Sequence, residues 1–512
     1  MKRFLALTLC LCLVLSGCAG GKGEYVPTGD GLNYDENYTG PQNKPSSPEK
    51  PQNLSLPYYA ERPLNPYLCE DFTNRALLSL IYQSLFTVDR DYVAEPQLCK
   101  NYVISKDMKS YTFYLEAATF SDGTPLTVED VIASLTAARE SNFYKGRFLH
   151  ITEIVATPDA GVTINLDTPY ETLPLLLDIP IVKAAEVALD RPLGTGPYTV
   201  YTATNGESLR RRSIWWCNPK MAITADTITL FAAKSTTQIR DQFEFADLSL
   251  VCADPGSDRY ADYRCDYELW DCENGIFLYL TTSRDSKIFT NDTVRIALTH
   301  AINRDALVEE HYRGFARSAS LPASPLFPYY SQNLAERYKY DPSKFAKAVK
   351  DSGLEGSTVV FLVNSDDSLR LRVARSIAQM LKDCGLVVEM KALRGNAYVE
   401  ALKFRNFDLY LGQTRLSPNM DLSAFFATYG ELSWGGVNDL GAYALSLQSL
   451  ENHGNYFTLH KLVMDNGLLC PILFRSYSIF AGRGLVSELT PARDNVFYYS
   501  LGKALESAQI QP

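Results

Sequence analysis

The sequence lacks a long apolar run in its interior, an excess of positive charge and more than a few histidines. No stretch of 18 apolar residues follows the N-terminus, and a membrane-spanning helix needs about 20, so a polytopic membrane protein is excluded. Lys and Arg number 49 against 59 Asp and Glu, a net charge of −10, which argues against a nucleic-acid partner. The 512 residues, 46% hydrophobic and 21% charged, fit a globular protein of about three domains or two large lobes.

Sequence motifs of catalysis are also missing. There is no GxSxG nucleophile elbow and no HExxH zinc motif. Gly194-Thr195-Gly196 is not a phosphate loop, because Pro197 removes an amide donor where a helix would begin. The five histidines stand apart and no CxxC pair occurs. We therefore expect no catalytic residues, no metal site and no cofactor.

The N-terminus is typical of a secreted lipoprotein. Lys2 and Arg3 precede an apolar run of 12 residues, Phe4 to Leu15, which is too short to cross a bilayer but suits a signal peptide. The run ends in Leu15-Ser16-Gly17-Cys18, which resembles the lipobox of bacterial lipoproteins. That resemblance implies a signal peptide at 1–17 and a lipidated Cys18. The alternative is an ordinary secretory signal that contains a cysteine.

Residues 18–57 are predicted to be the lipidated cysteine and a disordered tether. Between Ala19 and Pro57 there are six glycines and six prolines in 39 residues, and proline disfavours both helices and sheet ladders. A flexible coil of this length reaches roughly 35 Å. The expected architecture is a globular body held outside the bilayer by acyl chains on Cys18.

Eight cysteines lie beyond the signal region, an even number that permits disulfides in an extracellular protein. Cys252, Cys265 and Cys272 are close in sequence and are the best candidates for a bridge. The alternative is eight free, buried thiols.

Helix and strand patterns alternate along the body of the chain. Ser110 to Phe120 alternates apolar and polar side chains, as in a strand. Thr127 with Asp130 three residues later predicts a helix N-cap, and Ser365 to Cys384 carries four apolar residues at helical spacing. Short strands are expected at 387–390 and 407–411. The sequence therefore predicts an α/β fold.

The segment FSDGTPLTVEDV at 120–131 is the most specific motif of the chain. It matches 11 of 12 residues of the signature FSDGTPLTAEDV, and so resembles the family 5 extracellular solute-binding proteins, the peptide- and nickel-binding components of ABC importers. The resemblance covers nearly everything from about residue 60 to the end. Further matching pieces follow in the family's order, at Leu64–Pro66, Gly194–Tyr198, Val294–Leu298, Ala301–Arg304, Tyr340–Pro342 and Phe407–Gly412.

This resemblance implies a two-lobed α/β fold of the periplasmic-binding-protein type (class II), with a hinge and a ligand cleft between the lobes. By analogy, the first lobe comprises about 58–268 and 478–512, and the second comprises 269–477. Closure on a small solute is then the signal that ABC permease subunits read. We expect a monomer on the extracellular face of the membrane or in a periplasm.

The strand after Phe407 is expected to enter the cleft. Relatives typically continue with Gly-Trp and then Asp-Tyr, whose aspartate holds the N-terminal amine of a peptide. Here Gln413 replaces the tryptophan, and Leu416 or Ser417 stands at the amine-binding position. Asp421 matches only a later aspartate of the pattern. The resemblance therefore implies a ligand other than a standard free-amine oligopeptide.

Arg415 places a cation on this strand. A carboxylate or another anionic group of the ligand would suit it; the alternative is a solvated residue at the rim. Gly412, Gln413 and Thr414 on the same strand are further candidate ligand-binding residues, with Gln413 either a polar contact or a strand filler.

Three more candidates lie outside this strand. Trp434, in a Ser-Trp-Gly-Gly loop, either stacks on a ligand or anchors its own loop. Glu70 and Asp71 belong to a loop that faces the cleft in relatives. They either receive a ligand amine or act as charges favourable to a helix start.

The function predicted from the sequence is an extracellular lipoprotein that binds a peptide or peptide-like solute and delivers it to a membrane permease. Two alternatives within this class are a metal-chelate binder of the nickel type and a ligand-sensing lipoprotein without transport. A secreted hydrolase is the alternative from a different class.

Overall fold

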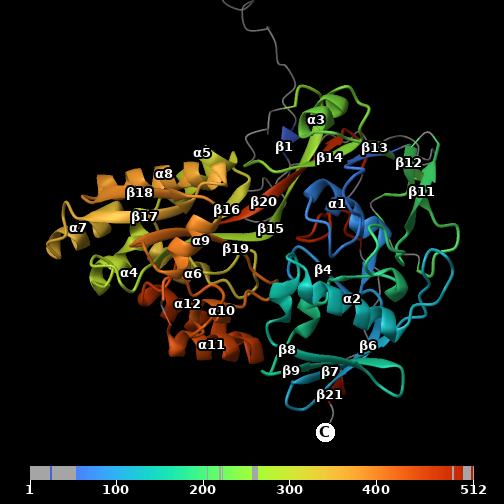
Figure 1. The fold of residues 1–512 in the computed structure, drawn as a ribbon, viewed down its shortest axis with the longest axis horizontal. Coiled ribbons are helices and arrows are strands. Elements are labelled where there is room, and N and C mark those ends of the chain that lie inside the picture. Colours follow the sequence, from blue (N-terminus) through green and yellow to red (C-terminus); the bar gives the residue numbers. More distant parts are fainter. Residues whose placement is uncertain are drawn as a thin grey trace, which may run out of the picture.

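The computed structural model describes residues 54–499, apart from 205, 218–220, 222, 257–262, 437 and 487–488, together with the short strands β1 (Glu24–Tyr25) and β21 (Gln509–Ile510). The described chain forms two α/β lobes that lie side by side (Figure 1). This is the architecture predicted from the sequence. The predicted signal peptide, Cys18 and most of the predicted tether lie outside the described residues.

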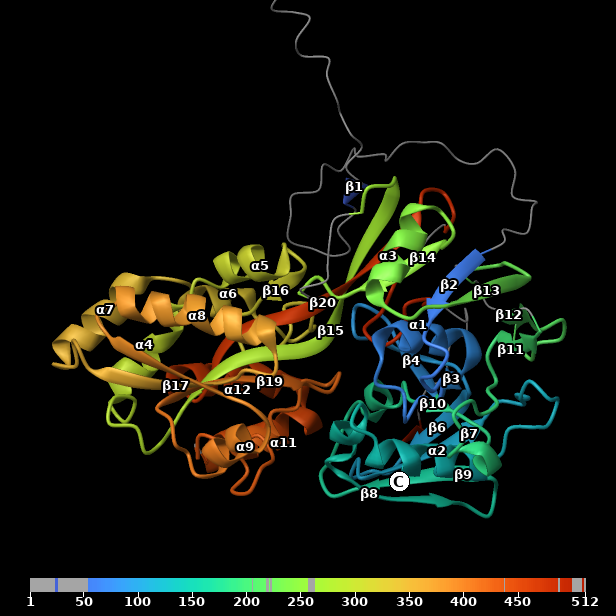
Figure 2. The ribbon, with the colours of Figure 1, turned by 45° about the horizontal axis from the view of Figure 1, so that its top comes forward.

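Two long antiparallel strands connect the lobes. β15 (Tyr267–Thr282) and β20 (Cys470–Gly482) pair along most of their length and run from one lobe into the other (Figure 2). Their pairing shifts register between Glu273 and Phe277, where Gly275 has a φ of +74°. The lobe boundaries predicted from the sequence fall inside these two strands.

The second lobe is built on the large sheet that contains β15 and β20. The strand order is β14-β20-β15-β19-β17-β18, with β16 beside β20 and β1 beside β15. β14 pairs with residues 478–481 of β20, where the sheet extends into the first lobe. Both faces are covered: along β19, Leu409 and Leu411 join an apolar cluster with α8, whereas Tyr410 joins a second cluster with α9. Alternation of side chains across a strand places each set on its own face.

The elements of this lobe are the helices α4 (Asp292–Ala301), α5 (Arg304–Tyr312), α6 (Gln332–Ala335), η4 (Glu336–Tyr338), α7 (Pro342–Asp351), α8 (Ser368–Asp383), α9 (Gly395–Lys403), α10 (Ser423–Phe426), α11 (Leu440–Glu451), η5 (His453–Asn455) and α12 (Tyr456–Asp465), and the strands β16 (Ala316–Ser318), β17 (Thr358–Asn364), β18 (Val387–Leu393) and β19 (Leu409–Arg415).

The first lobe packs smaller sheets around two helices. A five-stranded sheet has the order β21-β6-β7-β9-β8, and a four-stranded sheet has the order β11-β12-β13-β2. One continuous core joins both sheets to α1 and α2, and residues after β20, such as Val496 and Phe497, belong to it. The chain therefore returns to the first lobe after crossing through β20.

The helices here are α1 (Phe72–Ile81), α2 (Val128–Glu140), η1 (Lys145–Phe148), η2 (Leu173–Leu176), η3 (Ala184–Glu186) and α3 (Thr236–Glu244), and the strands are β2 (Leu54–Tyr58), β3 (Gln83–Ser84), β4 (Phe86–Val88), β5 (Ala94–Pro96), β6 (Cys99–Ile104), β7 (Ser110–Leu115), β8 (Ile151–Ala156), β9 (Gly161–Leu166), β10 (Pro180–Ile181), β11 (Tyr198–Ala203), β12 (Gly206–Arg211), β13 (Thr227–Ala232) and β14 (Leu250–Ala253).

The predicted start of α2 is confirmed. Thr127 is the N-cap: its hydroxyl accepts a hydrogen bond from the amide of Asp130, whose carboxylate accepts one from the amide of Thr127 at 2.8 Å. This reciprocal pair satisfies two amides that the first turn of a helix leaves without partners.

The predicted tether extends too far at its C-terminal end. Leu54–Tyr58 forms β2, which pairs in parallel with β13, and the side chains of Leu54, Leu56 and Tyr58 are buried. Because β2 is the edge strand of its sheet, Pro57 interrupts no central ladder. Burial of these apolar side chains therefore outweighs the proline-rich composition.

The three cysteines considered for a disulfide are free thiols. The bridge considered among Cys252, Cys265 and Cys272 therefore does not form. Burial raises the pKa of Cys69 to about 11 and that of Cys252 to about 12. These two thiols therefore stay protonated and unreactive near neutral pH.

Gly194 and Gly196 pack directly against the C-terminal end of α1. The amide of Gly196 donates to the carbonyl of Ile81 at 2.9 Å. A Cβ on Gly194 would lie 2.2 Å from that carbonyl oxygen, and one on Gly196 would lie 2.5 Å from the carbonyl carbon. These glycines allow two backbones to approach, which is a packing role and not phosphate binding.

Gly196→Ala is expected to lower the free energy of unfolding by about 2–4 kcal/mol, because the methyl group meets backbone that cannot rotate away. Urea unfolding followed by circular dichroism measures the change. Gly146→Ala is the control, since a Cβ there meets its nearest neighbour at an ordinary 3.7 Å. Equal stability of the two variants would contradict the packing role of Gly196.

Candidate functional site

Two adjoining cavities lie between the lobes, with volumes of about 420 Å³ and about 430 Å³. Phe143 and Arg493 of the first lobe and Thr414 and Arg415 of β19 line both cavities. We call the two together the interlobe cleft. Each volume is within the usual range for small-molecule sites, about 300–1,000 Å³.

The interlobe cleft is positively charged although the whole chain has a net charge of −10. Basic side chains that line it outnumber acidic ones by seven to five. An excess of one sign inside a cleft attracts small ions of the other sign. The basic residues are Arg75, Arg139, Lys145, Arg147, Arg415, Arg475 and Arg493, and the acidic residues are Glu70, Asp254, Asp421, Glu431 and Asp494.

Asp494 is the centre of the charged groups in the cleft. Its side chain is 7% exposed and forms ion pairs with Arg415 of the second lobe and with Arg147 of the first, the latter at 2.7 Å. Arg493 Nε lies 3.7 Å from the same carboxylate. Burial acts to raise the pKa of Asp494, but the three arginines outweigh it and hold the pKa well below its ordinary value. Asp494 is therefore ionised at every physiological pH.

Phe143 lies between two guanidinium groups. The Cζ of Arg75 is 3.2 Å from the centre of its ring, and the Cζ of Arg415 is 3.9 Å from it. Arg75 also donates to the carbonyl of Cys69 at 2.8 Å and to the hydroxyl of Tyr144 at 2.8 Å. These contacts hold Arg75 and Arg415, from different lobes, on one aromatic ring.

The irregular pairing of β15 with β20 positions the arginines. Arg415 Nε donates to the carbonyl of Asn274 at 3.1 Å. A Cβ on Gly275 would lie 2.4 Å from the Cζ of Arg493, so the guanidinium lies against a bare backbone. Gly275 also has the positive φ that glycine tolerates best.

Three of the residues predicted on β19 face the cleft. Thr414 and Arg415 line both cavities, and Gln413 lines the first, where its side-chain oxygen accepts a hydrogen bond from Arg475 at 3.4 Å. Arg415 is not a solvated rim residue, because its side chain is 20% exposed and ion-paired. The predicted ligand contacts of these residues stay a prediction.

Gly412 and Trp434 do not line either cavity. A Cβ on Gly412 would lie 2.4 Å from the Tyr279 ring, so close packing explains the glycine. Trp434 packs at the edge of the apolar cluster that contains Tyr410, which agrees with the alternative of a loop anchor.

The acidic candidates divide into two groups. Glu70 lines the first cavity and accepts a hydrogen bond from Asn142 at 3.0 Å, and Asp421 lines the second. Asp71 instead caps α1: its carboxylate accepts from the amide of Asn74 at 3.1 Å and pairs with Arg62. Asp71 is therefore a charged residue at the start of a helix, which is the alternative role that the sequence analysis gave it.

Sequence reasoning missed the other charged groups of the cleft. Arg475 is on β20, where it pairs with Asp254 at 2.6 Å, and Arg493 and Asp494 follow that strand. Arg147 belongs to η1. No motif or spacing links these residues to Arg415, so only the folded chain brings them together.

The lobes also touch beside the second cavity. His150 Nε2 lies 3.2 Å from a carboxylate oxygen of Asp421 and 3.2 Å from the hydroxyl of Ser423, while Nδ1 lies 3.0 Å from Asp167. Burial acts to lower the pKa of His150, but the carboxylates of Asp421 and Asp167 outweigh it and raise the pKa.

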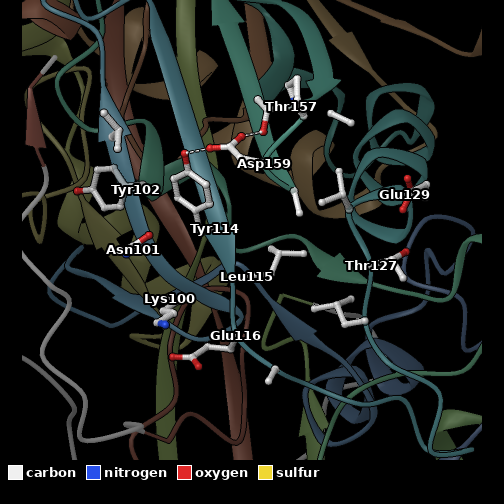
Figure 3. Close-up of a pocket in the computed structure, with 17 residues that line it drawn as sticks. Lys100, Asn101, Tyr102, Tyr114, Leu115, Glu116, Thr127, Glu129, Thr157 and Asp159 are labelled. Carbon is white, nitrogen blue, oxygen red and sulfur yellow. Dashed lines mark hydrogen bonds between the residues drawn. The ribbon is translucent and has the colours of Figure 1, made fainter.

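A further cavity of about 950 Å³ lies in the first lobe (Figure 3). Residues of β6, β7, α2 and the turn after β8 line it, and Tyr114 donates to Asp159 at 2.7 Å. It takes no wall from the second lobe. Lobe movement cannot enclose a solute there, so the interlobe cleft is the candidate site.

Within the ranges that the structure covers, no three His, Cys, Asp or Glu side chains are grouped so as to hold a metal ion. In the same ranges no helix is both long and apolar enough to span a bilayer.

The chain belongs to the bacterial extracellular solute-binding proteins of family 5, whose model matches residues 93–436. Members are solute-binding components of ABC importers. Among curated proteins, the chain is 26% identical over 401 residues to the glutathione-binding protein GsiB of Escherichia coli, covering 72% of this chain and 74% of GsiB.

Solved structures share the two-lobed fold. The substrate-binding protein CtaP of Listeria monocytogenes superimposes with a TM-score of 0.70 at 19% identity, over 87% of this chain and 97% of that chain. AppA of Clostridium difficile, described as a putative peptide binding protein, superimposes with a TM-score of 0.71 at 16% identity, over 87% and 98%.

The contact of His150 with Asp421 is expected to depend on pH. A proton is held more tightly when Asp421 is near, so protonation favours the touching lobes; this contribution is present below the raised pKa and is lost as the pH rises through it. Small-angle scattering of the unliganded protein from about pH 6.5 upward is expected to show an increasing radius of gyration.

His150→Gln is expected to flatten that pH profile. His311→Gln is the control, because His311 Nε2 contacts Ser376 at 2.9 Å inside the second lobe. A wild-type profile that His150→Gln leaves unaltered would exclude this histidine as its origin.

Proposed function

We propose that this chain is the extracellular solute-binding lipoprotein of an ABC importer and that it captures a peptide or peptide-like solute with an acidic group. The solute lies in the interlobe cleft and passes unchanged to permease subunits in the membrane. The observation that carries the proposal is the excess of arginine over carboxylate in a cleft formed by both lobes.

The absent amine clamp supports an acidic group as the main anchor. The hydroxyl of Ser417, at one of the two positions where relatives have their aspartate, donates to the carbonyl of Gly146 at 3.1 Å. Arg415 and Arg475 offer planar guanidinium groups, which bind carboxylates with two parallel hydrogen bonds. Glu70 at the edge of the first cavity is the acceptor that suits a solute amine.

The curated relatives support a peptide-like compound that carries an acidic group. They are named as glutathione-binding proteins, and glutathione is a modified tripeptide with two carboxylates. Glutathione is therefore the first compound to test here.

We extend the proposal to the anchor and the lobes. Signal peptide removal leaves Cys18 at the N-terminus, where acyl chains hold a monomer at the outer face of the membrane. The first lobe comprises 54–268 and the segment from 478 onward, the second comprises 269–477, and they move about β15 and β20.

A metal chelate is the second candidate solute. The related fold of NikA from Brucella suis was solved in complex with Fe(III)-EDTA, and EDTA is a polycarboxylate. The arginines of the cleft would grip such a chelate through its organic part, without a metal ligand from the protein. A ligand-sensing role without transport is distinguished by uptake of the solute that persists when the gene for this protein is deleted.

Native mass spectrometry of the purified protein tests the proposal first. The expected result is a co-purified compound of low mass that carries an acidic group. Thermal unfolding with glutathione, acidic tripeptides and Fe(III)-EDTA follows, because a ligand at 100 times its dissociation constant stabilises a protein by about 2.7 kcal/mol. Stabilisation by neutral peptides alone would overturn the acidic solute.

Arg415→Ala is expected to weaken binding of the identified solute by about 30-fold or more, since it removes a partly buried charge partner. Isothermal titration calorimetry measures the dissociation constant. Arg191→Ala removes a comparable arginine from an ion pair with Glu207, outside the cleft, and is expected to bind normally. Unchanged affinity of Arg415→Ala would remove this residue from the site.

Cys18→Ser is expected to release the protein from the membrane fraction into the medium or periplasm, because no acyl chains are attached. Fractionation with metabolic palmitate labelling measures the change. Label and membrane association that persist in the variant would contradict lipidation at Cys18.

A further inference from the structure

The charges at the centre of the cleft do not balance. Four guanidinium groups, from Arg75, Arg147, Arg415 and Arg493, surround Phe143 and Asp494; we call them the arginine cluster. Asp494 pairs with three of them, and Asp178 pairs with Arg147.

Glu273 is the third carboxylate near these arginines. It accepts hydrogen bonds from Tyr92 at 2.9 Å and from Ser324 at 2.7 Å, on the hinge side of Arg493. Even with Glu273 counted as ionised, three carboxylates face four guanidinium groups. Glu70 lines the first cavity but accepts its hydrogen bond from Asn142. At least one of the four guanidinium groups therefore has no ion-pair partner among the described residues.

Arg75 is the guanidinium without a carboxylate. Its hydrogen bonds go to the carbonyls of Pro66 and Cys69 and to the hydroxyl of Tyr144, and its face lies on Phe143. No acidic group lies within ion-pair distance of it in the described residues. Removing a charge from water is costly unless an opposite charge compensates it, so an acidic group in the first cavity would be stabilised.

We propose that Asp494 sets the charge of the solute: as a built-in carboxylate it fills one anion position of the arginine cluster, so the cleft takes a solute that brings one acidic group to the cluster and not two. This inference rests on the proposed function and names the class of solute more narrowly. Asp494 determines specificity in addition to joining the lobes through ion pairs, because it lines the first cavity and pairs with arginines of both lobes.

Two substitutions change the cluster charge in opposite directions. Asp494→Asn removes a negative charge while keeping the size of the side chain, so the cluster is expected to prefer a solute with one more acidic group. Arg75→Gln removes a positive charge, so the cluster is expected to prefer a solute with one acidic group fewer. A third variant, Glu207→Gln, is the control, since Glu207 pairs with Arg191 in the first lobe outside the cleft.

The probes are three C-terminally amidated tripeptides that carry no, one or two glutamates, and binding is measured by calorimetry. Wild type and Glu207→Gln are expected to favour the single glutamate. Asp494→Asn is expected to shift the affinity ratio toward two glutamates by about tenfold, and Arg75→Gln to shift it toward none by a similar factor. Ratios unchanged in both cleft variants, with binding retained, would overturn the inference and leave the proposed function standing.

A second measurement does not depend on peptides. Asp494→Asn is expected to unfold at a lower temperature than wild type and to recover most of the difference when succinate, a small dicarboxylate, is added; Glu207→Gln is not expected to recover. If no tripeptide binds any variant but succinate rescues Asp494→Asn, the charge role of Asp494 stands and the peptide-like solute is wrong. If succinate also fails, both are overturned. If Asp494→Asn does not fold, the tripeptide affinity ratio of Arg75→Gln alone tests the inference.

Discussion

The pairing of one buried carboxylate with arginines of two lobes is the interaction on which the cleft depends. Asp494 neutralises part of a cluster that would otherwise repel itself, and it does so across the space where a solute must enter. Like charges held this close in a partly dry interior are costly. Contact between the lobes at the arginine cluster therefore requires negative charge beside the arginines. A solute that brings an acidic group to the cluster favours this contact.

The fold supplies the frame for this arrangement. Crossing through β15 and β20 lets residues far apart in sequence, such as Phe143, Arg415 and Asp494, reach one small volume. The wide sheet of the second lobe is buried on both faces, so β19 presents Gln413, Thr414 and Arg415 from a rigid support. Rigid supports are what precise recognition of a carboxylate requires, because the two hydrogen bonds of a guanidinium are directional.

Local features of the sequence predicted local features of the structure. Thr127 and Asp130 cap α2 as their spacing indicated, and the strand after Phe407 does enter the cleft. The tether boundary was wrong where Leu54, Leu56 and Tyr58 form a buried strand. The partners of Arg415 were out of reach of sequence reasoning, because Arg147 and Asp494 lie 268 and 79 residues away from it along the chain and only tertiary packing joins them. The sequence could suggest that Arg415 binds an anionic group, but it could not identify Asp494 as the counter-ion of Arg415.

The register shift at Asn274 and Gly275 has a mechanical consequence. The same short segment interrupts the pairing of the two connecting strands and contacts Arg415 and Arg493, so the connection between the lobes and the support of the arginines share residues. A rearrangement of these arginines around a captured anion would therefore also shift the strands that connect the lobes, and with them the contact between His150 and Asp421. The arrangement of the two lobes would in this way report whether the cleft is occupied.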